Sequence, residues 1–185
     1  MTPRSTIVNT FAEWTAYSAL RSGLPNTVSR LRESLYPLIQ TPNYTAIISC
    51  NDVSPQEFDH WHEQNTLAIC EKAAGLPIGW ATKIINIYLK TRVYLAGDGP
   101  PSLVACIHPP IDNGLWQGIK GQYRNEPEIY DKTHIVNRIK NITDYTLYRT
   151  IIEGCRLIAA KRGCLLIEVE ELWMGTIGSA SSDME

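Results

Sequence analysis

Two helical patterns that meet at a break rich in glycine and proline constrain this chain more than any other feature. The run Ser54-Pro55-Gln56-Glu57 is a capping box with proline at the first helical position, which predicts a helix from about 55 to 74. The run 75–79, GLPIG, ends that helix, and apolar side chains then recur at helical spacing from about 78 to 95. We therefore expect two helices joined by a tight apolar hairpin.

Helical periodicity and capping residues predict further helices elsewhere in the chain. They cover residues 5–21, residues 26–39 after the cap Asn26, a stretch that begins at Asp112 or Asn113, and residues 144–163. The pattern therefore predicts a mainly α protein, a single helical domain with a helix-hairpin-helix-like element and at most short strands.

Three shorter stretches are not assigned by periodicity. The apolar runs at 44–50 and 103–107 fit a strand or a helix, and residues 164–173 are extended or helical. We expect the domain to span residues 1–175 and the polar residues 176–185 to form a disordered tail.

Length and composition predict one hydrophobic core that needs no disulfide or metal ion for its stability. The chain has 185 residues, 44% of them apolar, and its five cysteines are odd in number and form no C-x-x-C pair. His60 and His62 lie two apart on a predicted helix and so face different ways, and we expect neither a metal nor a cofactor. No run of eighteen apolar residues and no signal-peptide pattern is visible, which predicts a cytoplasmic protein without a membrane partner.

Charge is distributed unevenly along the chain. Residues 113–163 carry nine Lys and Arg against five Asp and Glu, whereas residues 164–185 carry five acids and no basic residue. The basic stretch from Lys120 to Arg162 can neutralise nucleic-acid phosphates, or it can be the ordinary solvated face of helices.

Two side chains between Trp61 and Trp116 are unusual for packing alone. Lys83 lies early in the second predicted helix, where the helix dipole disfavours a cation, so it is either a nucleophilic or phosphate-binding lysine or a surface lysine on an amphipathic helix. Asp112 follows the rigid run His108-Pro109-Pro110 at a helix start. It is either a helix cap or a functional carboxylate, and one side chain can be both.

These residues resemble the motifs of the helix-hairpin-helix DNA glycosylase superfamily. That family's hairpin reads approximately L-P-G-x-G-x-K-x-x-N-x-x-L, and Gly79, Lys83, Asn86 and Leu89 match it in mutual spacing. The family's catalytic acid follows in a P/A-V-D-x-x-[VIL] segment, which Ile111, Asp112 and Leu115 match. About 40 residues are covered, and Ala81 stands where the family has its second hairpin glycine.

The resemblance implies an enzyme that acts on a modified, flipped base in DNA. In that family hairpin amides grip a DNA phosphate and the aspartate assists departure of the base. In members that also cleave the strand, the hairpin lysine forms a Schiff base with the sugar. Lys83 would then be the nucleophile and Asp112 the catalytic carboxylate, with DNA as partner.

Further side chains are candidates for binding. Trp61, His62 and Trp116 are candidates to line a base pocket, although core packing explains each as well. His62 and His108 can equally form partly buried hydrogen bonds. Asn86 shares one side of its helix with Lys83.

A second hypothesis involves no chemistry. The motifs E-F-x-x-W-H at 57–62, K-x-x-N-x-x-L-K at 83–90 and H-x-P-I-D at 108–112 resemble, in this order, those of an uncharacterised bacterial protein family. That resemblance implies a family without a reaction. The alternative is therefore a non-catalytic helical domain that binds nucleic acid or a protein.

Overall fold

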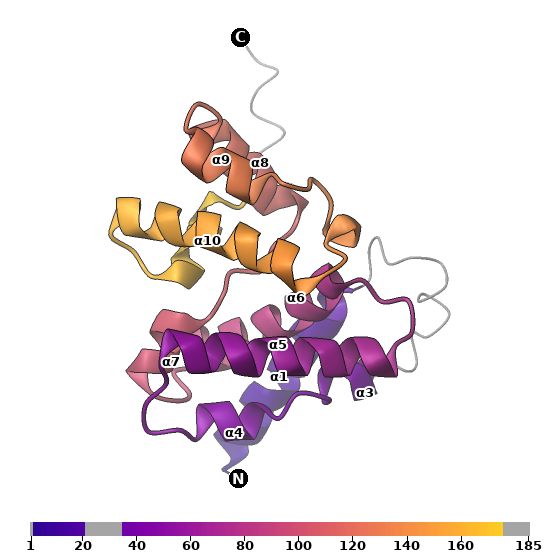
Figure 1. Ribbon diagram of the computed structural model, residues 1–185. Coiled ribbons are helices and arrows are strands. Elements are labelled where there is room, and N and C mark those ends of the chain that lie inside the picture. The colour runs from indigo at the N-terminus through magenta and orange to yellow at the C-terminus, as the bar shows by residue number, and fades with distance from the viewer. Residues whose placement is uncertain (1, 21–34, 176–185) are drawn as a thin grey trace, which may run out of the picture.

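The computed structural model of the protein describes residues 2–20 and 35–175, and this part of the chain contains helices and no strand (Figure 1). In chain order the elements are α1 (Pro3–Ala19), α3 (Leu35–Ile39), α4 (Tyr44–Ile48), α5 (Pro55–Lys72), α6 (Ile78–Leu89), the π-helical turn η2 (Lys90–Leu95), α7 (Pro101–Cys106), α8 (Asn113–Tyr123), α9 (Pro127–Thr133), the 3-10 turn η3 (Ile139–Asn141), α10 (Tyr145–Arg162) and the 3-10 turn η4 (Leu166–Leu172). The predicted mainly α class is confirmed. Most of the helix expected at 26–39, and the tail at 176–185, lie outside the described residues.

The predicted hairpin between α5 and α6 is present. Ser54 Oγ accepts a hydrogen bond from the Glu57 amide (3.3 Å), and the Glu57 carboxylate accepts one from the Ser54 amide (2.8 Å), so both halves of the capping box form. Gly75 turns the chain with φ of +86°, a left-handed conformation that favours glycine. The second helix, expected to run unchanged to residue 95, widens after Leu89 into η2.

The short runs that periodicity left open are helical turns, one of them with a side-chain cap and one with proline at its start. The Asn43 side chain accepts from the Ala46 amide (3.2 Å), and the run that follows is the helix α4. Pro101 opens the helix α7, and residues 166–172 form the 3-10 turn η4. The helix α9 was not predicted, although Pro127 and Glu128 in its first turn are start signals.

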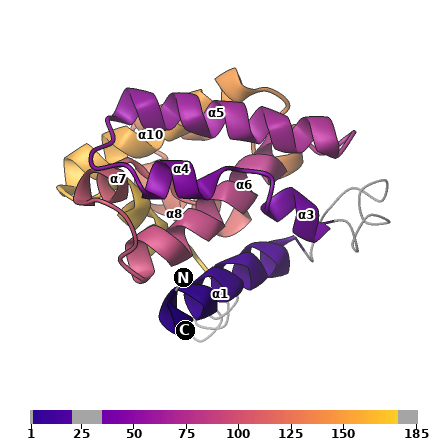
Figure 2. The ribbon, with the colours of Figure 1, turned by 90° about the horizontal axis from the view of Figure 1, so that it is seen from below.

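Two hydrophobic clusters fill the described part of the molecule. One is built mainly from α1 and α3 to α7, and the other from α8, α9, α10 and η4, which lie together above the first group in Figure 1. Figure 2 shows α6 running between α5 and α1, and it packs against both. None of the described helices is long and apolar enough to cross a membrane.

Two glycines of α8 allow the segment after η4 to lie directly on that helix. Gly114 and Gly118 are one turn apart, and the Gly114 carbonyl accepts from the Met174 amide (3.2 Å). A Cβ at Gly118 would lie 1.7 Å from the Leu172 carbonyl oxygen, and one at Gly114 would lie 2.3 Å from the Trp173 indole nitrogen. Any side chain at either position would push this segment away.

We predict that Gly118→Ala lowers the free energy of unfolding by about 1–3 kcal/mol, because the added methyl group meets the Leu172 backbone and forces this segment to shift from its packed position. The matched control is Gly121→Ala in the same helix, where an added Cβ would have no neighbour within 4 Å. That control should stabilise the protein by up to about 1 kcal/mol through helix propensity. Urea unfolding of both variants measures the difference, and equal effects would contradict this packing.

Candidate active site

Lys83 and Asp112, 29 positions apart in the sequence, meet in space. Lys83 Nζ on α6 lies 3.2 Å from Asp112 Oδ2. Asp112 is the N-cap of α8, where Oδ1 accepts from the Leu115 amide (3.1 Å). The predicted role of Asp112 as a helix cap requires this bond. The two side chains are only 12% and 25% exposed, so solvent screens their attraction less than at an open surface.

A third residue, Trp173, completes this arrangement and was not found from the sequence. Its indole Nε1 donates to Asp112 Oδ1 (2.9 Å) from 61 positions away. Lys83 Nζ also lies 5.5 Å from the centre of the Trp80 ring, within range of a cation–π attraction. The only hint of Trp173 in the sequence is the glycine pair in α8 that leaves room for it.

The Lys83–Asp112 pair lines a cleft of about 640 Å³, which we call the tryptophan cleft. Its walls combine tryptophan rings with cationic and amide side chains: Trp80, Lys83, Asp112, Asn113, Gly114, Trp116, Asn137, Arg138, Ile139, Lys140, Trp173 and Met174. Three cations and one carboxylate give the cleft a positive lining. Aromatic faces beside fixed charges suit a planar ligand that carries negative charge.

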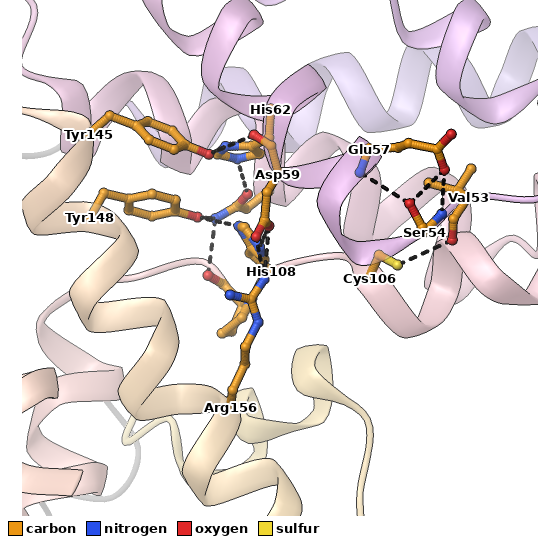
Figure 3. A network of polar contacts seen from close by, with 12 residues as sticks. Val53, Ser54, Glu57, Asp59, His62, Cys106, His108, Tyr145, Tyr148 and Arg156 are labelled. Atoms are coloured by element: carbon orange, nitrogen blue, oxygen red, sulfur yellow. Dashed lines mark hydrogen bonds and ion pairs between the residues drawn. The ribbon is translucent and has the colours of Figure 1, made fainter. Parts of the chain in front are cut away.

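His62 and Asn86 do not line this cleft, and both are buried in a polar network. Figure 3 shows His62 in this network with His108, Tyr145 and Tyr148. Asn86 Nδ2 donates to the Pro109 carbonyl (3.1 Å), which can only accept, so Asn86 Oδ1 faces His62 Nε2 and accepts from it (2.9 Å). A neutral His62 then accepts at Nδ1 from the Tyr145 hydroxyl (2.8 Å). The hydrogen bonds therefore assign the tautomer of His62.

His108 occupies an equivalent position in the same network. The Asp59 carboxylate can only accept, so His108 Nε2 donates to it (3.0 Å), and His108 Nδ1 accepts from the Tyr148 hydroxyl (3.0 Å). The Tyr148 oxygen accepts in turn from Asn86 Nδ2 (2.9 Å), which joins the two halves of the network. Arg156 closes the far end by donating to both oxygens of Asp59, at 2.8 Å each.

Burial and hydrogen bonding shift the pKa values of the network in the directions that these bonds require. Burial lowers the pKa of His62 to about 3. Burial likewise lowers the pKa of His108, with the hydrogen bond to Asp59 opposing it. For Asp59 burial acts to raise the pKa, but the hydrogen bonds from His108 and Arg156 outweigh it and hold the pKa at about 2. Both imidazoles are therefore neutral and Asp59 is ionised at pH 7.

The network ties the two halves of the Lys83–Asp112 pair together. Asn86 lies one helical turn after Lys83, and the carbonyl that it binds belongs to Pro109, three residues before Asp112. Since Asn86 is 1% exposed, this bond is shielded from water. The network therefore positions the pair and does not touch a ligand in the cleft.

The remaining predicted binding residues lie in different surroundings. Trp116 lines the cleft, and its indole nitrogen donates to the Thr133 carbonyl (2.7 Å). Trp61 packs against Tyr44 and Phe58, away from the cleft.

The Gly79 amide, which the resemblance assigns to phosphate binding, donates to the Ile142 carbonyl (3.1 Å). The segment that contains η3 thus covers the start of α6. Because the Gly79 amide already has this partner within the protein, it is not free to donate to a phosphate in this structure.

Comparison of the chain with known protein families, with curated proteins and with solved structures gives no match. In residues 2–20 and 35–175, no three His, Cys, Asp or Glu side chains are placed to hold a metal ion.

Neutral, buried histidines predict a stability that falls in acid. An unfolded histidine titrates near its ordinary pKa of 6.5 and the folded His62 near 3, so between these values the unfolded chain binds more protons. The stabilisation is complete above pH 6.5 and is lost as the pH falls towards 3. We expect His62 to lower the free energy of unfolding by about 1.4 kcal/mol per pH unit over this range.

Urea unfolding between pH 4 and 7 measures this slope, and the loss of the slope in His62→Gln would assign it. His60→Gln is the control, because His60 lies on the exposed face of the same helix. A pH-independent free energy of unfolding in the wild type would contradict the neutral network.

Proposed function

We propose that this protein is an enzyme of the helix-hairpin-helix DNA glycosylase type, which holds a flipped, modified base in the tryptophan cleft. The observation that carries the proposal is the approach of Lys83 Nζ to Asp112 Oδ2 (3.2 Å) in the wall of that cleft. An amine next to a carboxylate is the pair of groups that amine attack on a sugar carbon requires.

The cleft suits a nucleobase in size and in chemistry. Its volume of about 640 Å³ lies within the range of about 300–1,000 Å³ typical of small-molecule sites. Stacking of a base on an aromatic side chain contributes about 1–3 kcal/mol, and Trp173, which is 47% exposed, offers such a face. Trp80 and Trp116 are each 3% exposed and contribute only a small part of their rings to the cleft wall. Asn113 and Asn137 supply amide donors and acceptors for a base edge.

The proposed reaction begins with proton transfer from Lys83. Asp112 Oδ2 accepts the proton, and the freed lone pair of Nζ forms a bond to the sugar carbon C1′ as the bond from C1′ to the base breaks. The bonding electron pair leaves with the base, which takes the proton back from Asp112. The sugar ring then opens: one proton passes from Nζ to the ring oxygen O4′, the bond between C1′ and O4′ breaks, and the remaining lone pair of Nζ forms an iminium with C1′. Borohydride reduces this iminium to a stable amine.

We predict that borohydride traps the wild-type protein on a duplex with a single abasic site, and that Lys83→Ala abolishes the adduct. An abasic aldehyde needs no base removal, so this probe tests the lysine whatever the base specificity. Denaturing gel electrophoresis measures the adduct. Lys72→Ala, on the exposed end of α5, is the matched control and should trap like the wild type. Unchanged trapping in Lys83→Ala would exclude the role of Lys83.

A second variant tests the carboxylate. Asp112→Asn keeps an oxygen that can cap α8 but cannot accept the lysine proton, so we expect base release to slow by about 10²–10⁴-fold with little loss of stability. Duplexes with uracil, 8-oxoguanine or ethenoadenine serve as substrates. A wild type that releases none of these bases and forms no abasic adduct would contradict the enzyme proposal.

One observation favours the non-catalytic alternative, a nucleic-acid-binding domain. Both oxygens of Asp112 are occupied, Oδ1 by the Leu115 amide and Trp173 and Oδ2 by Lys83. In this alternative the ion pair has a structural role alone: it ties α6 to the start of α8 and takes part in no reaction.

This alternative predicts coupling between the two side chains in stability. A double-mutant cycle of Lys83→Gln and Asp112→Asn, measured by urea unfolding, should give a coupling energy of about 0.5–3 kcal/mol. Coupled changes in the free energy of unfolding, together with the absence of a borohydride adduct, would support the non-catalytic domain. Additive changes would exclude a structural role for the ion pair.

A further inference from the structure

We infer that the segment Asn137–Lys140, and not the α5–α6 hairpin, binds a backbone phosphate of the nucleic acid whose base enters the tryptophan cleft. The inference rests on the proposed occupant of the cleft but not on the reaction. It assigns a phosphate site to residues that the hairpin resemblance does not include.

The first reason is that the hairpin is covered. The Gly79 amide donates to the Ile142 carbonyl (3.1 Å), and a Cβ at Gly79 would lie 2.3 Å from the Ile139 carbonyl oxygen. Backbone of the 139–142 segment therefore occupies the place where a phosphate would approach this amide. Binding there would require the segment to leave and the amide to lose its partner.

The second reason is that the covering segment brings cations of its own. Arg138 and Lys140 flank Ile139, both are exposed, and both line the cleft. In the part of the chain that the structure describes, neither side chain forms an ion pair, whereas Lys83 is paired with Asp112. Their charges are thus available to a ligand, and Arg138 can present two parallel N–H donors to a phosphate.

The third reason is the balance of charge and surface within the cleft. Lys83, Arg138 and Lys140 face a single carboxylate, that of Asp112, so the lining retains an excess of positive charge. The aromatic faces lie in the same cleft as these cations. A nucleotide unit matches both features, since its base is planar and its phosphate is anionic.

The test is salt-dependent binding of a fluorescein-labelled duplex that contains one tetrahydrofuran abasic analogue. This analogue cannot form a Schiff base, so fluorescence anisotropy reports binding without chemistry. Each phosphate neutralised on B-DNA contributes about 0.9 to the slope of log K against log salt. The double variant Arg138→Gln/Lys140→Gln removes the contact to this one phosphate, so it should reduce the slope by about 0.9 and weaken binding most at low salt.

The matched control is Lys120→Gln/Arg124→Gln. It makes the same change of charge within the same basic stretch, but these exposed residues do not line the cleft. It should keep the wild-type slope. Thermal unfolding of both double variants checks that each is folded.

The outcomes separate this inference from the proposed reaction. Equal slopes for the wild type and Arg138→Gln/Lys140→Gln, or equal losses in both double variants, would overturn the phosphate site even if borohydride traps an adduct. A slope that depends on Arg138 and Lys140 without any adduct on an aldehyde-bearing duplex would support the site and exclude the lyase reaction. No binding of the duplex by the wild type would overturn both.

Discussion

The side-chain amide of Asn86 is the interaction on which the rest of the structure depends. It is 1% exposed, and it bonds to His62, Pro109 and Tyr148 from three other parts of the chain. A buried amide that lost one of these partners would incur about 1–3 kcal/mol for each group left unsatisfied. The network thus favours one mutual arrangement of α5, α6, α10 and the segment before α8.

That arrangement fixes the distance between the two groups of the candidate site. Lys83 is carried on the helix that holds Asn86, and Asp112 ends the rigid proline-containing segment whose carbonyl Asn86 binds. The Trp173 indole restrains the carboxylate from a third direction. A pair held in this way loses little freedom when a ligand binds, which is the physical meaning of a preorganised site. The buried histidines act through this geometry, and not through contact with a ligand.

The segment around η3 changes how a helix-hairpin-helix element would be used here. It covers the start of α6, since the Gly79 amide is bonded to Ile142, and it carries two exposed cations to the rim of the cleft. Phosphate binding by Arg138 and Lys140, in place of the hairpin amides, would use charged side chains instead of the fixed dipoles of the backbone. Binding through such charges depends more strongly on salt, because each phosphate contact releases counterions.

The sequence by itself determined the features that depend on neighbours within one turn of helix. The capping box at Ser54 and the cap at Asp112 follow from side chains that bond to backbone a few residues away. The end of α10 follows from Gly163, which lacks a Cβ and so adopts the left-handed conformation without strain. The mainly α class followed from the same local patterns. The resemblance to the glycosylase hairpin selected Lys83 and Asp112 for a common site, and the structure brings them together.

Only the tertiary structure decided which polar residues face the cleft and which are buried. Periodicity located His62 and Asn86 on helices, but their burial depends on Tyr145 and Tyr148 from a distant helix. Trp173 and the cations beside η3 reach the cleft through chain segments more than 20 positions from both Asp112 and Lys83, and no local pattern encodes such contacts. The physical reason is that local hydrogen bonds specify where a helix begins and ends, whereas packing and the satisfaction of buried polar groups specify which faces meet.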